Sequence, residues 1–223
     1  MPDKTDWFHD AKYGLFVHYL YASQEDFASF NAEAFAEAVN DTGAKYIVMT
    51  LGQNSGWYCS PNAVYENYIG VSEGTFCSAR DIPMEAADAL SKYGIKLMLY
   101  LPAQGPSAAG DDIPRALGAV ERHDETNWYI NHTYADRWSH VLREWSTRYG
   151  DKVAGWWFDG LYEGTGYTGD MADHVSKLYK DACRAGNKNS IVAFNQGVMN
   201  GIIKPATNAC DYTAGEENSF EFY

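Results

Sequence analysis

Short runs of apolar residues alternate with longer amphipathic stretches along the whole chain, and this alternation restricts the possible folds more than any other feature. Five of the six runs are nearly continuous in apolar residues, as expected of parallel strands that are buried on both faces. Strands that alternate with helices in this way predict an α/β fold with a parallel sheet. The runs are "YGLFVHY" (13–19), "KYIVMTLG" (45–52), "IKLMLYLPA" (95–103), "VAGWWFDG" (153–160), "SIVAFNQG" (190–197) and the less apolar "CDYTAGE" (210–216).

The stretches between the runs carry the signals of helix ends. Capping residues and closing glycines predict helices over 31–41, 81–94, 133–150 and 170–185. In the third of these, large side chains recur at helical spacing and form one apolar face. They are Tyr134, Trp138, Val141, Leu142, Trp145 and Tyr149.

The first run is not followed by a glycine-rich phosphate-binding loop, which argues against a doubly wound dinucleotide-binding fold. The sequence instead favours a (β/α)8 TIM-type barrel, of which this chain supplies about six βα units. Since a closed barrel needs eight strands, typically within about 250 residues, we expect residues 1–223 to form one catalytic barrel domain that is incomplete at its C-terminus. An open arc of strands exposes two edges, so an oligomer is possible.

The formal net charge of −13 restricts the partners of the chain. Such an acidic protein repels phosphate backbones and anionic lipids, so neither nucleic acid nor a membrane is an expected partner. A sulfated glycan would need a local basic site that the sequence does not show. The polar N-terminus "MPDKTDWFHDAKYG" has no signal-peptide core. We therefore expect a cytoplasmic protein, although a leader already removed from a secreted or periplasmic protein is compatible with the sequence.

The cysteines give no sign of a metal site. Cys59, Cys77, Cys183 and Cys210 are widely spaced, without a C-x-x-C pair or ordered histidine partners. We predict that they are buried, reduced thiols and that the chain binds no metal.

Polar residues follow each apolar run, at the point where the predicted strand ends. In a parallel barrel these C-terminal ends open onto one face, where the active sites of barrel enzymes lie. Six polar sets from distant segments would therefore form one ring around a pocket. They are His18, Gln53 with Asn54, Gln104, Asp159, Asn195 with Gln196, and Glu216 with Glu217.

Structural roles are open for several of these residues. Asp159 and Gly160 are also the residues of a tight turn, although a glycine-rich stretch and a helix follow here rather than a second strand. A lone histidine such as His18 is often a satisfied core residue. Gln53 and Asn54 are equally suited to satisfying the backbone of their loop.

The chemistry of the predicted ring suits sugar hydroxyls. Aromatic residues make up 15% of the chain, and their flat faces suit sugar rings as well as cores. Trp57, in the polar loop "GQNSGWYCSPN", is the best candidate for a sugar-facing ring, and Trp157 is a second. Two carboxyl groups suffice to hydrolyse a glycosidic bond, with retention at a separation of roughly 5–5.5 Å and inversion at a wider one.

Four segments resemble the α-L-fucosidase family of glycoside hydrolases. They are "WFHDAKYGLFVHY", "TGAKYIVMT", "ARDIP" and "WWFDG". The resemblance implies retaining hydrolysis of terminal α-L-fucose without a cofactor, on a (β/α) barrel usually followed by a β-domain. It assigns Asp159 as the nucleophile and His18 as a sugar-binding residue, and "DYTAGEE" makes Glu216 the candidate acid/base. Glu217 or a residue beyond Tyr223 are the alternatives for that role.

One departure from the family pattern affects the predicted substrate. The family has paired histidines followed by Asp-Gly-Phe after its second strand, whereas this chain reads Gln53-Asn54-Ser55-Gly56-Trp57. Amides still bond to hydroxyls but do not carry a proton charge near neutral pH. A glycosidase for another sugar, such as galactose, and a catalytically silent carbohydrate-binding barrel therefore stay as alternatives.

Overall fold

The computed structural model describes residues 3–125, 127–199, 204–214 and 216–217, and it places Met199, Glu216 and Glu217 by their backbone alone. Its main sheet has five parallel strands in the order β1-β2-β3-β4-β5, so neighbours in sequence are neighbours in space. The strands are β1 (Leu15–Val17), β2 (Tyr46–Thr50), β3 (Lys96–Pro102), β4 (Val153–Asp159) and β5 (Ile191–Phe194). All five lie within the predicted runs.

Eight α-helices are assigned within the described residues, and four of them match the predicted helices. The matching ones are α3 (Ala32–Asp41), α5 (Ile82–Ser91), α7 (His132–Tyr149) and α8 (Gly169–Arg184). The caps explain two of these starts, because Asn31 accepts from the Ala34 amide and Asp81 from the Met84 amide. Four short helices were not predicted, namely α1 (Asp6–Asp10), α2 (Gln24–Ala28), α4 (Ala63–Ile69) and α6 (Asp112–Ala116).

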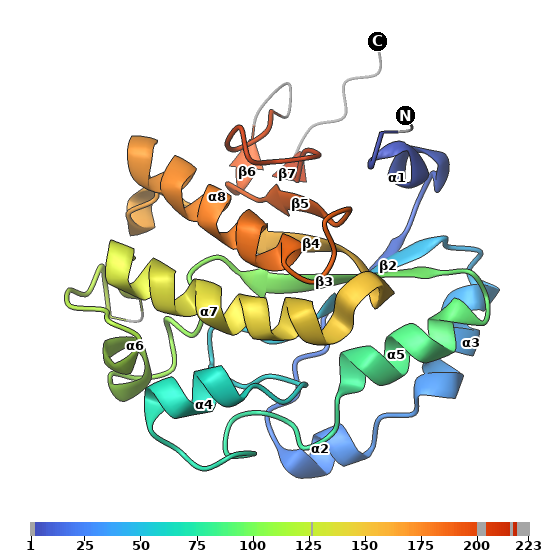
Figure 1. Ribbon diagram of the computed structural model, residues 1–223, viewed down its shortest axis with the longest axis horizontal. Coiled ribbons are helices and arrows are strands. Elements are labelled where there is room, and N and C mark those ends of the chain that lie inside the picture. The colour runs from blue at the N-terminus through green and yellow to red at the C-terminus, as the bar shows by residue number, and fades with distance from the viewer. Residues whose placement is uncertain (1–2, 126, 200–203, 215, 218–223) are drawn as a thin grey trace.

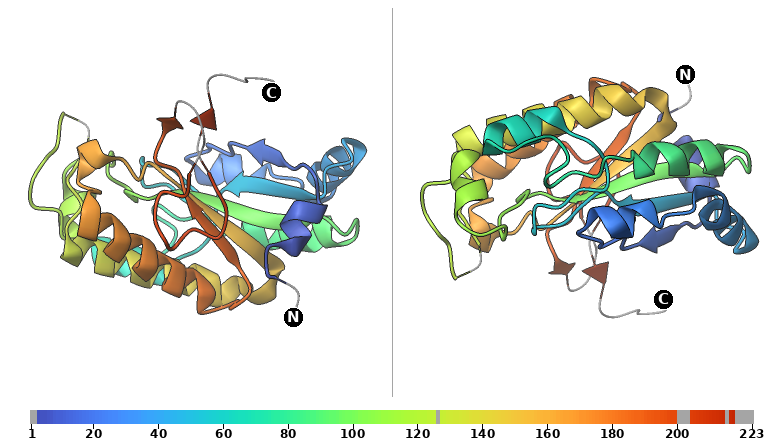
Figure 2. Two further views of the ribbon diagram at one scale, coloured as in Figure 1. Left: turned by 90° about the horizontal axis from the view of Figure 1, so that it is seen from above. Right: turned by 90° about the horizontal axis from the view of Figure 1, so that it is seen from below.

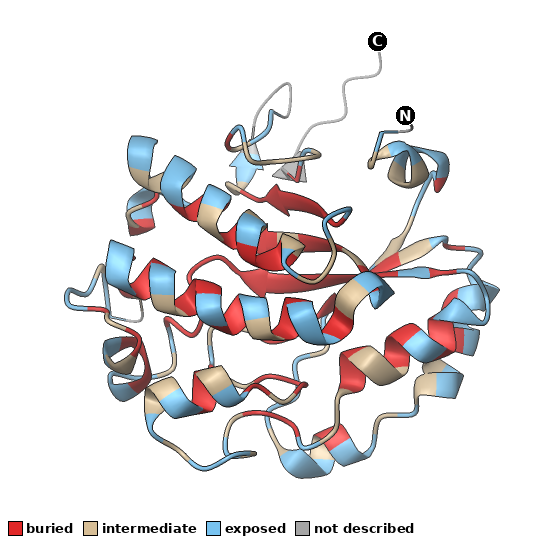
Figure 3. Ribbon diagram, viewed as in Figure 1, coloured by how far each residue is buried: buried red, intermediate tan, exposed pale blue. Residues whose placement is uncertain are grey.

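The larger part of the core lies between the sheet and the long helices. Helices α7 and α8 run side by side across one face of the sheet (Figure 1). The six large side chains predicted for the apolar face of α7 are all buried. Figure 3 shows the result, since the central strands are buried along most of their length while α7 and α8 expose only their outer sides.

The other face of the sheet carries a smaller cluster. Successive side chains of a strand point to opposite faces, so Trp156 and Phe158 pack towards the helices while Trp157 and Asp159 share the opposite face. Val48, Met98, Tyr100 and Ile191 form the centre of this second cluster, and α1 packs Trp7 and Phe8 against it. The face that bears Asp159 is thus partly filled with aromatic side chains.

The sixth predicted strand is wrong for residues 210–214, which form no strand. The segment nevertheless runs beside β5, because the Asp211 amide donates to the Val192 carbonyl at 2.7 Å. The Asp211 carboxylate accepts from the Val192 amide at 2.9 Å, so a side chain stands where a strand would offer a backbone carbonyl. Two short strands, β6 (Val198–Met199) and β7 (Glu216–Glu217), pair in parallel as a separate sheet.

The main sheet is an open one of five parallel strands in the described residues, which confirms the predicted α/β fold with a parallel sheet, while the predicted barrel architecture, with about six βα units from this chain, stays a prediction. Strand β1 lies at one edge, and its Phe16, which contacts Tyr100 and Trp157 on the face that bears Asp159, is 42% exposed. Strands β6 and β7 stand on the side of the sheet away from α7 and α8 (Figure 2). They therefore lie on the side to which Asp159 belongs.

The four cysteines are free, as expected, with three of them buried and Cys210 half-buried. Burial raises the pKa of the Cys59 thiol, so this side chain is an uncharged part of the core. Within the described part of the chain, no helix combines the length and the apolar character needed to cross a membrane.

Candidate active site

Asp159, the last residue of β4, is held by three hydrogen-bond donors at the C-terminal end of the sheet. Its Oδ2 accepts from the Tyr100 hydroxyl at 2.8 Å. Its Oδ1 accepts from the Asn195 side-chain amide at 2.8 Å and from the Gly160 backbone amide at 2.9 Å. These three donors fix the direction of the carboxylate that ends this apolar strand.

Strand register places these donors. Tyr100 of β3 pairs with Trp157 of β4, so its side chain lies on the same face as Asp159. Asn195 directly follows β5, and its backbone amide donates to the Phe158 carbonyl at 2.7 Å. The oxygen of the Asn195 side chain accepts from the Gly197 amide at 2.9 Å, which orients its nitrogen towards Asp159.

Tyr100 is a residue of the candidate site that the sequence analysis missed. It lies inside an apolar run, and the only signal was a single hydroxyl on the inward-facing side of a predicted strand. Burial raises the pKa of Tyr100, and the negative charge of Asp159 raises it further. The phenol thus stays protonated and donates. Gln53 extends the network, since its Nε2 donates to the Tyr100 hydroxyl at 3.0 Å.

His18 belongs to the same side of the sheet. It follows β1, is exposed, and its ring meets that of Tyr100 edge to face with centroids 5.4 Å apart. Its Nδ1 lies 3.5 Å from the Thr50 hydroxyl. Since Tyr100 contacts both His18 and Asp159, the structure brings the predicted histidine and aspartate together around one tyrosine.

Trp157 lies two residues before Asp159 on the same face of β4 and is therefore nearer to the middle of the sheet. Its ring is half-buried and meets Phe16 edge to face at 5.4 Å and Tyr212 at 6.2 Å. Trp157 is therefore part of the aromatic cluster on the face of the sheet that also bears Asp159 and Tyr100.

Two predicted site residues have structural contacts instead. The Asn54 side-chain amide donates to the Gly105 carbonyl at 3.1 Å and to the Ser107 hydroxyl at 3.0 Å, so it ties its loop to the one after β3. Trp57 packs edge to face against Phe76 at 5.3 Å and joins the core on the helix side of the sheet. The sequence could not separate these roles because both residues lie in a polar loop after a strand.

The predicted acid/base falls where the structure gives only the backbone. Glu216 and the alternative Glu217 form β7, and their side chains lie outside the described residues. Residue 223 is also outside them. Within the described residues, no group of three or more His, Cys, Asp or Glu side chains is arranged to hold a metal ion.

Comparison with known structures shows a similar fold in endo-fucoidan hydrolases and in an α-L-fucosidase. The endo-fucoidan hydrolase MfFcnA4 from glycoside hydrolase family 107 matches 87% of this chain and 34% of its own, with a TM-score of 0.61 and 16% identity. The α-L-fucosidase AlfC from Lactobacillus casei, in complex with α-L-fucose product, matches 87% of this chain and 70% of its own, with a TM-score of 0.54 and 20% identity. This chain thus spans about a third of the length of MfFcnA4.

These two enzymes therefore share their fold with this chain. The chain belongs to the α-L-fucosidase family, whose model matches residues 21–219. No curated protein matches it in sequence.

Proposed function

We propose that this protein is a retaining, exo-acting α-L-fucosidase in which Asp159 is the nucleophile and Glu216 the acid/base, without a cofactor. The cradle of Tyr100, Asn195 and Gly160 around the Asp159 carboxylate is the observation that carries the proposal. A glycosidase nucleophile has to be fixed in direction towards the anomeric carbon, and three donors hold this carboxylate in place.

The contacts of the two carboxylate oxygens suggest which one attacks. Within the described residues, Oδ1 accepts two hydrogen bonds and Oδ2 accepts one, from Tyr100. A carboxylate oxygen has about two acceptor positions, so Oδ2 of Asp159 keeps a lone pair for the anomeric carbon. In the first step this oxygen bonds to that carbon, the glycosidic bond breaks, and the acid gives its proton to the leaving oxygen. Water then releases the sugar while the same acid, now a base, takes a proton.

Glu216 is assigned to the proton transfer because of the family resemblance and the position of β7. That strand lies on the side of the sheet away from α7 and α8, which is the side of Asp159 (Figure 2). We also infer that the five parallel strands are successive strands of a (β/α)8 barrel, in which the exposed inner face at Phe16 would be covered by further strands.

Azide rescue tests the role of Asp159. Asp159→Ala should lower turnover of an aryl α-L-fucoside by several orders of magnitude, and added azide should restore part of it and yield a glycosyl azide of inverted configuration. Asp181→Ala, an exposed aspartate of α8, is the matched control and should keep full activity. Unchanged turnover in Asp159→Ala would remove this residue from the mechanism.

A catalytically silent carbohydrate-binding protein is the second candidate. The side-chain contacts of Gln53 and Asn54 favour it, because both amides hold neighbouring protein groups and neither supplies a titratable proton. Calorimetric binding of fucose without hydrolysis over days would support this candidate against the first. A panel of aryl glycosides, including an α-galactoside, decides the sugar.

A further inference from the structure

Gln104, two residues after β3, carries a buried amide that bonds to the loop after β4. Its side chain belongs to a residue that is 6% exposed. The Gln104 Nε2 donates to the Gly160 carbonyl at 3.3 Å and to the Thr165 hydroxyl at 2.8 Å, while its Oε1 accepts from the Ser107 hydroxyl at 3.4 Å. Because a buried polar group is costly to leave unbonded, these contacts fix the direction of the amide.

The backbone around Gln104 is itself attached to the rest of the fold. The buried Tyr134 of α7 donates its hydroxyl to the Gln104 carbonyl at 2.8 Å. The preceding residue, Ala103, accepts from the Tyr167 hydroxyl at 2.7 Å and donates its amide to the Asp159 carbonyl at 2.6 Å. The Gln104 side chain therefore extends from a fixed support and can restrain the loop that it reaches.

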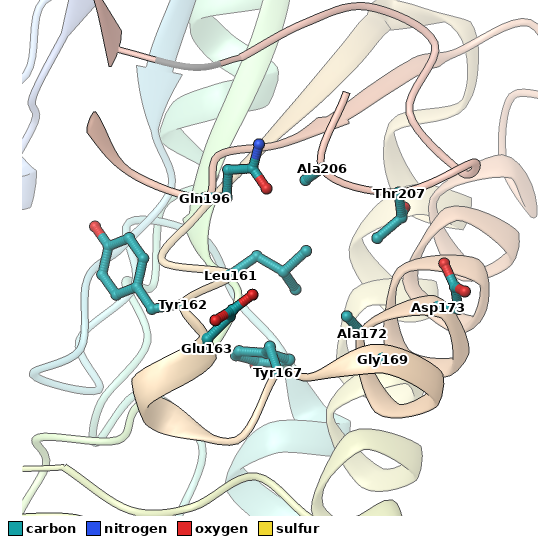
Figure 4. A pocket seen from close by; sticks show the side chains of 10 residues that line it. All are labelled: Leu161, Tyr162, Glu163, Tyr167, Gly169, Ala172, Asp173, Gln196, Ala206 and Thr207. Carbon is teal, nitrogen blue, oxygen red and sulfur yellow. The ribbon is translucent and has the colours of Figure 1, made fainter. Parts of the chain in front are cut away.

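The peptide group between Gly160 and Leu161 is held on both sides. Its carbonyl accepts from Gln104, and its N–H donates to the Asn195 carbonyl at 2.8 Å. Figure 4 shows Leu161 beside Gln196, the residue that follows Asn195. Gly160 has a φ of +80°, and glycine adopts several backbone conformations at little cost. The orientation of this peptide group therefore depends on its two hydrogen-bond partners.

Gly160 and Asn195 are also the two residues that donate to Oδ1 of Asp159. The Gly160 amide lies 2.9 Å from this oxygen, and the Asn195 side-chain amide lies 2.8 Å from it. A rotation of the peptide group after Gly160 would shift both donors, because one adjoins that group in the chain and the other is bonded to it. Gln104 opposes this rotation from the side away from Asn195.

We infer that Gln104 is a positioning residue of the candidate active site, which acts through Gly160 and Asn195 on the direction of the Asp159 carboxylate. The sequence analysis counted Gln104 among the polar groups around a pocket, whereas its burial and its bonds give it a supporting role behind the loop. The inference rests on the proposed function where it assigns a catalytic effect to the direction of the carboxylate.

Gln104→Met tests the inference, because methionine keeps the length of the side chain and lacks the amide. For an aryl α-L-fucoside, kcat should fall about 10- to 100-fold, the cost of a small displacement of reacting groups. KM should change less than about threefold, since no group that binds the sugar is removed. Thr165→Val is the matched control, because it removes the other bond of the same amide and leaves the Gly160 bond in place. It should keep kcat within about threefold of wild type.

Amide hydrogen exchange provides a readout that does not depend on activity. Gln104→Met should speed exchange of the Leu161 amide at least about tenfold, and Thr165→Val should not. Unchanged exchange in Gln104→Met would overturn the inference, and faster exchange with an unaltered kcat would overturn its catalytic part. A wild-type protein that does not turn over the aryl α-L-fucoside would overturn the proposed function, while the exchange measurement would still decide whether Gln104 orients the loop.

Gln104→Glu is a second variant that keeps the shape of the side chain if Gln104→Met does not fold. Its carboxyl donates to the Gly160 carbonyl when it is protonated and cannot do so when it is ionised. The ratio of its kcat to that of wild type should therefore rise as the pH falls from about 8 to about 5, towards the range in which a glutamate binds its proton. A ratio that stays constant over this range would contradict the inference.

Discussion

Tyr100 connects most of the side chains in the candidate active site. It donates to Asp159, accepts from Gln53 and contacts the ring of His18. Loss of its hydroxyl would remove one of the three hydrogen bonds to Asp159 and leave the carboxylate itself in place.

Tyr100→Phe should lower kcat/KM for an aryl α-L-fucoside by about 10- to 100-fold. A hydrogen bond to a charged group contributes about 1.5–3 kcal/mol, and each 1.4 kcal/mol corresponds to about a tenfold change. Tyr93→Phe, at an exposed tyrosine just after α5, serves as the control and should leave kcat/KM unchanged. Steady-state kinetics of both variants check this, and an unaltered Tyr100→Phe enzyme would mean that Asp159 does not depend on this bond.

Among single residues, the sequence predicted the position of a side chain best at the ends of strands. Asp159 and Asn195 follow neighbouring parallel strands, and the structure brings them within hydrogen-bond distance. It predicted poorly in loops, because the spacing of Asn54 and Trp57 does not show that one bonds to the next loop and the other packs into the core. Tyr100 was missed because nothing in a run of apolar neighbours indicates that its hydroxyl bonds to Asp159.

Between elements, Asp211 joins three segments through one buried carboxylate. Its side chain is 4% exposed and pairs with Lys4 at 2.9 Å, Lys180 at 2.9 Å and Arg184 at 2.8 Å, while it accepts from the Val192 amide. Burial alone would raise the pKa of Asp211, but the hydrogen bonds from Lys4, Lys180 and Val192 and the charge of Arg184 outweigh it and lower that pKa. The network attaches the N-terminal segment and α8 to the edge of β5.

Asp211→Asn should lower the free energy of unfolding at pH 7 by about 2 kcal/mol, less than for a fully buried pair because the cations are partly exposed. Since the folded pKa is lowered, the unfolded chain binds the proton more readily, and the contribution of Asp211 is lost as the pH falls from about 4 towards the folded pKa. Urea unfolding at pH 7 and below pH 4 measures this. The difference from wild type should shrink at the lower pH, whereas the exposed Asp181→Asn should show no effect at either. A constant difference would contradict the ionic origin.

Helices α7 and α8 approach closely at Gly186, just after α8. An added Cβ there would lie 1.8 Å from the Ser146 carbonyl oxygen, which is backbone and can move only with its helix. Gly186→Ala should therefore destabilise the protein by about 3 kcal/mol, the upper part of the usual range for overpacking. Gly164→Ala, where the nearest atom would be 3.9 Å away, should change stability by less than about 0.5 kcal/mol. Thermal and urea unfolding compare the two, and equal effects would show that α7 and α8 separate at little cost.

Local sequence signals were sufficient to predict helix ends and helix faces. The Asn31 and Asp81 caps and the apolar face of α7 were readable because capping and helical spacing are local. Over residues 210–214, the predicted sixth strand failed for a non-local reason. The Asp211 side chain takes the Val192 amide that a sixth strand would use, and no local pattern reports that exchange.

For the whole molecule, strand order could be predicted because each parallel strand follows the previous one through a helix. Whether the sheet closes into a barrel could not be predicted from local patterns. Closure depends on pairing between edge strands that are far apart in the sequence, whereas strand order depends on strands that follow one another. Phe16 and His18 are exposed although they belong to an apolar run, because β1 is an edge strand of an open sheet. The similar folds of MfFcnA4 and AlfC also show that one architecture serves both an endo-acting and a fucoside-cleaving enzyme.

The acidity of the whole chain leads to a prediction about substrate charge. With 30 acidic and 17 basic side chains, the protein repels anionic glycans over a distance set by the ionic strength, about 30 Å at 0.01 M salt and 10 Å at 0.1 M. A neutral aryl α-L-fucoside should therefore show a kcat/KM that changes less than about twofold between these salt concentrations. A sulfated aryl α-L-fucoside should be the poorer substrate at 0.01 M salt and improve several-fold at 0.1 M, because added ions screen the repulsion. Steady-state kinetics with both substrates in the same buffers measure the two slopes. A sulfated substrate that is preferred at low salt would instead require a local cationic site, and the field of the whole protein would then not govern substrate choice.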